Sequence, residues 1–128
     1  VETLPAGGPV PTPEKVLGYV AGTPFKLTHA ADVHRYLRAL AAATPRVKVF
    51  SIGTSEEGRE MVVALVSDEK NLARLEQNKQ LMDQLADPRR TNPAAAAKAI
   101  AEVTPFYWLT GSLHSTETGS PEMLMELA

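Results

Sequence analysis

Apolar residues follow a helical spacing in the first third of the chain. Their recurrence at i, i+3, i+4 and i+7 predicts an amphipathic helix that is capped by Thr28 and stopped by Pro45. One face of this helix should therefore pack on a core. The residues of that face are Val33, Tyr36, Leu37 and Leu40.

Three further helices are predicted in the second half of the chain. An apolar stripe predicts one over residues 70–86, which ends before Pro88. Asn92 should cap an alanine-rich helix, and Ser120 should cap the last helix, each with a proline in its first turn.

Three runs rich in β-branched and aromatic residues predict strands. Residues 47–52 and 61–66 are separated by a segment with two glycines that allow positive φ, so these runs should form a hairpin. The second run is almost continuously apolar, which predicts burial on both faces. Residues 106–113 are predicted as a further strand of the same sheet.

The order of these elements predicts an α/β fold in which a mixed sheet is covered by helices. Residues 1–27 are rich in Pro and Gly and should form an extended arm, and residues 28–128 should belong to one domain. The last helix reaches Ala128 without a capping glycine, so we expect a fold truncated before the second half of its sheet. Such a truncated sheet would expose an edge and favour self-association.

Composition narrows the classes of partner and chemistry. The chain has 13 Lys and Arg against 15 Asp and Glu, and its basic residues form no continuous stripe. Nucleic acid is therefore not an expected partner. No apolar stretch has the length of a membrane span, so no membrane partner is expected. Without cysteine, only His and carboxylates remain as strong metal ligands. The chain begins at Val1, which indicates removal of an upstream segment; a cleaved secretion signal, and hence a secreted or periplasmic location, is one origin.

The segment LTGSLHSTETGSPEML, residues 109–124, contains the candidate chemical site. His114 and Glu117 lie between the last predicted strand and the last predicted helix, where sites form in open α/β sheets. A histidine and a carboxylate on a tight turn can converge on one zinc ion. The alternative is a polar loop, or a carboxylate that interacts with the dipole of the next helix. A catalytic zinc site also needs a third protein ligand.

Two motifs in this order resemble the zinc carboxypeptidases of the carboxypeptidase A type. SIGTSEEGREMVVALVS is similar to the hairpin of that family with its Glu-Gly-Arg signature, and TGSLHSTETGSPEMLMELA is similar to its Gly-x-His-x-x-Glu segment. The resemblance covers residues 28–128 and implies the N-terminal part of a three-layer α/β/α catalytic domain. It implies that His114 and Glu117 are the first two zinc ligands and that zinc is the cofactor. Peptide or protein C-termini are the implied substrates.

The chain also departs from the family. Gly111 lies three residues before the histidine, close to the family's glycine, and Thr116 stands where many members have a substrate-binding arginine. No substrate role therefore carries over to Thr116. Residues 67–105 exceed the usual connection and resemble larger bacterial members. The third zinc ligand, the substrate-binding residues and the general base of the family lie downstream of its motif, so no catalytic residue is assigned in this chain.

His29 and His34 are weighed as substitutes for the third ligand, against ordinary exposed or boundary positions on the first helix. With two ligands and no base, the chain alone should bind zinc weakly and hydrolyse nothing. Three functions remain open: a zinc metallocarboxypeptidase, a zinc amidohydrolase acting on N-acyl amino acids such as acylated aspartate or succinylated glutamate, and a non-catalytic remnant or binding domain. The Glu-Gly-Arg hairpin at residues 57–59 favours the first.

Overall fold

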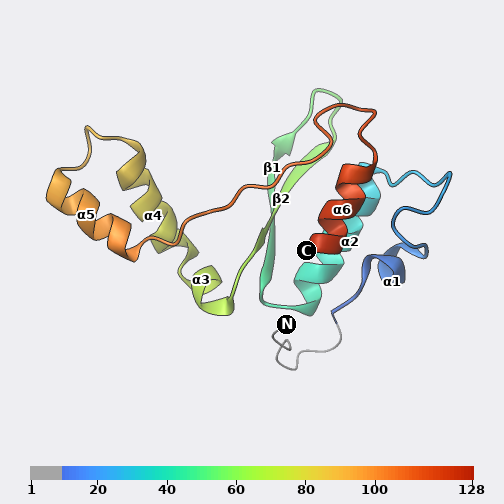
Figure 1. Ribbon diagram of the computed structural model, residues 1–128, viewed down its shortest axis with the longest axis horizontal. Helices are drawn as coiled ribbons and strands as arrows, with labels where there is room; N and C mark the ends of the chain where they lie inside the picture. The colour runs from blue at the N-terminus through green and yellow to red at the C-terminus, as the bar shows by residue number, and fades with distance from the viewer. Residues whose placement is uncertain (1–9) are drawn as a thin grey trace. The chain divides into compact units, whose positions relative to one another are not determined.

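The computed structural model describes residues 10–128. The chain divides into two compact units: the residues up to Ser67 together with Leu109–Ala128, and Asp68–Trp108. No helix within the described residues is both long and apolar enough to cross a membrane. In chain order the elements (Figure 1) are α1 (Pro13–Leu17), α2 (Ala30–Ala43), β1 (Val47–Thr54), β2 (Glu60–Val66), α3 (Glu69–Ala73), α4 (Leu75–Ala86), α5 (Pro93–Glu102) and α6 (Gly119–Leu127).

The predicted hairpin is confirmed by the antiparallel pairing of β1 with β2. The register pairs Val47 with Val66 and shifts at Ile52, which forms a bulge. Gly53 and Gly58 take φ values of 121° and 74°, which residues with a side chain rarely adopt. The two glycines in the connecting segment were therefore a correct signal.

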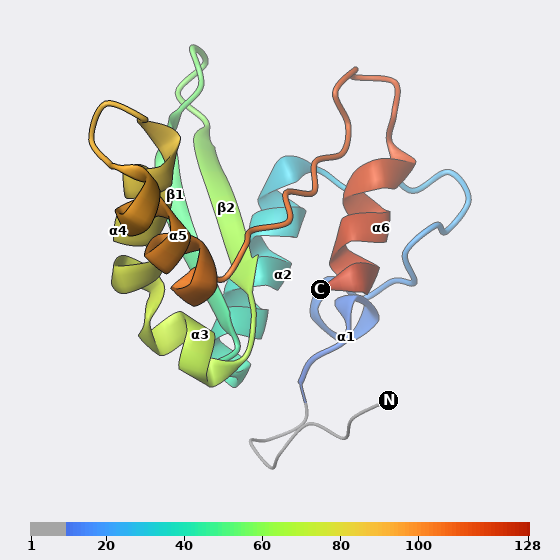
Figure 2. The ribbon, with the colours of Figure 1, turned by 60° about the vertical axis from the view of Figure 1, so that its left-hand side comes forward.

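The core of the first unit confirms the apolar face predicted for α2. Tyr36 and Leu40 are 3% and 2% exposed, and they pack with Val47 of β1. From the other end of the sequence, α6 adds Met125, which is 1% exposed. Figure 2 shows α6 beside α2, so segments far apart in sequence share one core. Partly buried around it are Val10, Val16, Leu17, Val33, Leu37, Ala41 and Val49.

The region predicted as an extended arm contains the short helix α1, and residues 1–9 of the arm lie outside the described part of the chain. The Thr12 side chain caps α1, and Gly18 ends it at a φ of 82°. Thr28 does not cap α2 as predicted, because its hydroxyl donates to Glu122 Oε1 at 2.6 Å. The residue at the N-cap position is His29, which makes no side-chain capping bond.

In the second unit, Asp68–Trp108, Leu72 and Ala99 are buried. The single helix predicted over residues 70–86 is wrong in one respect. It is interrupted at Arg74, whose φ of −97° and ψ of 13° leave the helical range and whose N–H is shared between two carbonyls. Asn92 does cap α5, because its Oδ1 accepts from Ala95 N at 2.9 Å. That α4 and α5 cover the sheet stays a prediction.

The strand predicted over residues 106–113 is wrong. The sheet of the described residues has two strands, and this segment belongs to neither. A run of apolar residues becomes a strand only when a partner pairs with its backbone, and nothing local supplies that partner. Its side chains stay accessible, with Tyr107 87% and Leu113 89% exposed.

Two further sequence expectations need correction. No residue of β2 is fully buried, and Met61 and Val66 are 41% and 52% exposed, because a two-stranded sheet packed on α2 through β1 leaves apolar side chains uncovered. The last helix begins at Gly119 with Thr118 at its N-cap position, and not with Ser120 as the cap. The side chain of Thr118 makes no capping bond, so this helix end is weakly defined by its sequence.

Candidate metal centre

The two candidate ligands lie on one tight turn that leads into α6. Glu117 N donates to His114 O at 3.1 Å, which closes the turn, and Ser120 N donates to Glu117 O at 3.4 Å, which joins it to the helix. Gly111 lies so close to α6 that a Cβ atom there would be 2.7 Å from Ser120 Cβ. The turn is therefore attached to the helix on both of its sides.

The imidazole of His114 and the carboxylate of Glu117 face each other. His114 Nδ1 is 2.8 Å from Glu117 Oε1, and His114 N donates to Oε2 of the same carboxylate at 3.2 Å. The expectation that the two side chains converge is confirmed. The side chains of His114 and Glu117 are 71% and 44% exposed, so a solute can reach the pair.

The surroundings of Glu117 favour its ionised form. The hydrogen bond with the His114 side chain lowers the pKa of the carboxyl, and the backbone N–H groups of His114 and Leu113 lower it further, against a smaller opposing effect of burial. An ionised carboxylate only accepts hydrogen bonds, so Nδ1 of His114 must carry the proton in this pair.

The chemistry of this pair fits a zinc ion. Imidazole nitrogen and carboxylate oxygen are both zinc ligands, and two tetrahedral ligands at about 2.0–2.2 Å from the ion lie roughly 3.4 Å apart. The observed separation of 2.8 Å is slightly shorter. His114 and Glu117 are therefore the residues of this turn that would hold the ion.

A third ligand is not gathered at this place. Within residues 10–128, no three His, Asp or Glu side chains lie close enough together to hold one metal ion. His29 and His34 both belong to the start of α2, and neither forms such a group with the pair. Of the motif residues, Arg59 binds Glu57 at 2.7 Å with both side chains largely exposed, and Thr116 is exposed in the turn. The described residues therefore supply two ligands.

Two residues that sequence analysis did not rank take part in the surroundings of the turn. Ser112 has a φ of 62°, and its hydroxyl donates to Glu117 O at 2.8 Å. Glu122, which is 9% exposed on α6, accepts from Gly22 N and from Thr28 Oγ1, each at 2.6 Å. A serine between Gly111 and Leu113 carries no signal of positive φ, and a glutamate in a first helical turn normally indicates only a favourable dipole interaction.

The fold and the pair together define a class: an α/β chain with a histidine–carboxylate pair of the kind that metallohydrolases use to bind zinc. Comparison with known families makes this specific. A sequence model described as zinc carboxypeptidase matches residues 33–128, which is most of the 128-residue chain. The chain belongs to the zinc carboxypeptidase family, whose members are metallopeptidases. A search of curated proteins and a search of solved structures each found no match.

Proposed function

We propose that this chain is the N-terminal part, residues 28–128, of the catalytic domain of a zinc metallocarboxypeptidase that hydrolyses C-terminal peptide bonds. His114 and Glu117 are its first two zinc ligands. The observation that carries the proposal is the approach of Nδ1 to Oε1 within 2.8 Å, on an accessible turn of a zinc carboxypeptidase chain.

In this proposal the protein prepares the ligands before the ion arrives. The hydrogen bonds to Glu117 favour its ionised form, so a carboxylate already lies beside the imidazole of His114. Both ligands come from one turn that is bonded to α6, which limits how far they can separate. The chemistry that zinc supplies when bound is polarisation of the scissile carbonyl and activation of water.

Other catalytic groups are expected outside the residues described here. The family resemblance places the third ligand, the general base and the groups that bind the substrate carboxylate after the His-x-x-Glu segment. Residues 1–128 alone should therefore hold zinc weakly, since two protein ligands leave the remaining positions to water, and they should cleave nothing.

The metal assignment is tested by zinc affinity, measured by competition with a chelating dye. His114→Ala and Glu117→Gln should each weaken binding by more than the roughly 10- to 100-fold that loss of a hydrogen-bond partner of a ligand costs. His34→Ala and Glu57→Gln are matched controls, because they remove the same chemical groups elsewhere on the first unit. Equal affinity of His114→Ala and the unsubstituted chain would contradict the assignment.

The reaction is tested on a longer protein that includes the residues the family places downstream. It should cleave peptides with a free C-terminus, spare amidated ones, and lose activity to a chelator. Release of amino acids from N-acyl substrates instead would favour the amidohydrolase, and a protein that is inactive and free of zinc would favour the remnant domain. Chelator-sensitive cleavage by residues 1–128 alone would contradict the two-ligand assignment.

A further inference from the structure

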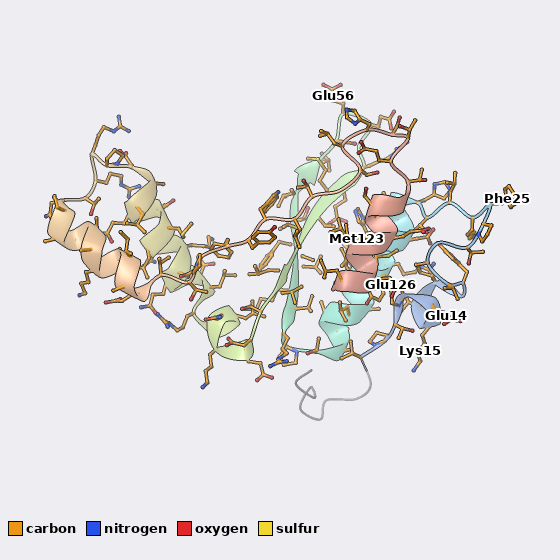
Figure 3. The ribbon with its side chains drawn as sticks, viewed as in Figure 1. Glu14, Lys15, Phe25, Glu56, Met123 and Glu126 are labelled. Carbon is orange, nitrogen blue, oxygen red and sulfur yellow. The ribbon has the colours of Figure 1, made fainter. Side chains whose placement is uncertain are left out.

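Ser112 has a backbone conformation that its side chain does not favour. Its φ of 62° lies in the left-handed region, where a Cβ atom crowds the following carbonyl. Among residues 10–128, the non-glycine residues with positive φ are Ser112 and Phe25. Phe25 projects from the surface of its loop (Figure 3), whereas Ser112 is half-buried beside the candidate ligands. Such a conformation persists only where surrounding contacts hold it.

Contacts on both sides hold Ser112 in place. On its N-terminal side, Gly111 lies against Ser120 and Leu124 of α6, so the chain cannot move further toward the helix. On its C-terminal side, the Ser112 hydroxyl donates to Glu117 O at 2.8 Å and so joins the beginning of the turn to its end. The same carbonyl accepts from Ser120 N, so Ser112, Glu117 and α6 are joined at one atom.

The hydroxyl of Ser112 influences the ligand pair through the backbone of Glu117, to which it is hydrogen-bonded. It binds the backbone of Glu117, while the carboxylate of Glu117 binds both the ring and the N–H of His114. Without the hydroxyl, the carbonyl oxygen of Glu117 keeps its longer bond from Ser120 N, at 3.4 Å, and Glu117 N stays bonded to His114 O at 3.1 Å. With one contact fewer on its backbone, Glu117 would hold its carboxylate less firmly against the imidazole.

We propose that Ser112 is a positioning residue for the metal-binding turn, and that its hydroxyl holds the Glu117 carboxylate against Nδ1 of His114. The purpose of this positioning rests on the proposed function, but the hydrogen bonds that produce it join only residues of this chain. It can therefore be measured without zinc.

The experiment is nitrogen NMR of the imidazole rings in the metal-free chain, at a pH where the rings are neutral. In the unsubstituted chain His114 should carry its proton on Nδ1, because Glu117 accepts it. Ser112→Gly removes the hydroxyl but adopts positive φ without strain, so it isolates the hydroxyl from the backbone conformation. This variant should populate both tautomers of His114, with His29 and His34 unchanged as internal references.

Zinc affinity is the second readout, and Ser115→Ala is the matched control. Ser115 is an exposed serine of the same turn, so its loss should change neither the tautomer nor the affinity. Ser112→Gly should bind zinc about fivefold more weakly, as expected for one lost neutral hydrogen bond. Ser112→Ala, which keeps the strain and loses the bond, should be at least as weak, and the circular dichroism spectrum shows whether each variant is folded.

The outcomes separate this inference from the proposed function. An Nδ1-protonated His114 in folded Ser112→Gly, with unchanged zinc affinity, would overturn the positioning role and leave the metal site standing. A tautomer change in Ser112→Gly in a chain whose zinc affinity does not depend on His114 would support the positioning role and overturn the metal function.

Discussion

Gly111 is the residue at which the candidate ligand turn meets α6, and its small size is what matters there. A Cβ atom at this position would lie 2.7 Å from Ser120 Cβ and 3.1 Å from Leu124 Cδ1. Gly111→Ala should therefore push the turn off the helix and lower the free energy of unfolding by about 1–3 kcal/mol, as overpacking does. Urea denaturation measures this. Gly119→Ala is the control, because a Cβ there meets nothing within 4 Å, and equal midpoints for the two variants would contradict the prediction.

Glu60 links β2 to α2, because its carboxylate accepts hydrogen bonds from Arg38. Hydrogen bonds from the Arg38 guanidinium, at 2.7 and 2.8 Å, lower the pKa of Glu60. A lowered pKa in the folded state means that folding favours the ionised form. The stabilisation is thus complete above the ordinary glutamate pKa of about 4.3 and disappears as the pH falls through the lower folded value.

Glu60→Gln should accordingly lower the melting temperature at pH 7 and change it little at pH 3. Glu56→Gln, at the exposed tip of the hairpin (Figure 3), makes the same chemical change without the Arg38 contact. It should shift the melting temperature equally little at both pH values. A Glu60→Gln effect as large at pH 3 as at pH 7 would show that packing, and not the ion pair, explains it.

Contacts between side chains could be predicted from the sequence where they depend on the spacing of the residues along the chain. His114 and Glu117 are three positions apart, and a tight turn brings such residues together, so their convergence could be predicted. Ser112 could not be ranked, because its φ of 62° is imposed by contacts with Glu117 and α6 that form only in the fold. Similarly, Thr28 is a good cap by type, but a glutamate far along the chain binds its hydroxyl.

Among the elements, α6 joins the site to the core through one face. Met125 is 1% exposed, whereas Met123, which is labelled in Figure 3, is 52% exposed. Two residues along an α-helix correspond to about 200°, so the two side chains leave opposite sides of α6. Met125→Ala should cost about 2–5 kcal/mol of unfolding free energy, because it leaves a cavity between α6 and α2. Met123→Ala should stay within roughly 0.5 kcal/mol, as surface changes usually do. Comparable losses in the two variants, measured by urea denaturation, would mean that α6 does not pack through this face.

Elements whose partners are near in sequence could be predicted, and elements with distant partners could not. The hairpin is defined by the glycines between its strands, and α5 by its own cap at Asn92. Residues 106–113 have a similar apolar composition but no local partner, so composition alone did not make them a strand. The break at Arg74 has no breaker residue in the sequence, and only the backbone conformation reveals it.

At the scale of the whole molecule, the long connection noted in the sequence is a compact unit. Within Asp68–Trp108, the Asn78 side chain binds both the N–H and the carbonyl of Thr104, each at 2.7 Å, and so fastens the end of the segment to α4. Leu72 and Ala99 are buried in the same unit. The hydrogen bonds between Asn78 and Thr104 join residues far apart in this segment, which helical periodicity alone could not predict.

The hairpin of β1 and β2 is the part of the chain through which we expect molecules to associate. In the described part of the chain, β1 and β2 each pair with one strand, so each has an edge that no further strand covers, and a two-stranded sheet is marginally stable by itself. Its strands also expose Phe50, Ile52 and Met61, by 39%, 57% and 41%. Molecules of this chain should therefore associate through the sheet at high concentration, and sedimentation velocity should show species larger than 13.8 kDa. Ile52→Lys places a charge among these apolar residues and should keep the chain monomeric, since charged residues on exposed strands oppose pairing. Ile100→Lys is the control, because it places the same charge at a similarly exposed isoleucine of α5, and it should leave association unchanged. If Ile100→Lys alone abolished association, the contact would have to be assigned to the second unit.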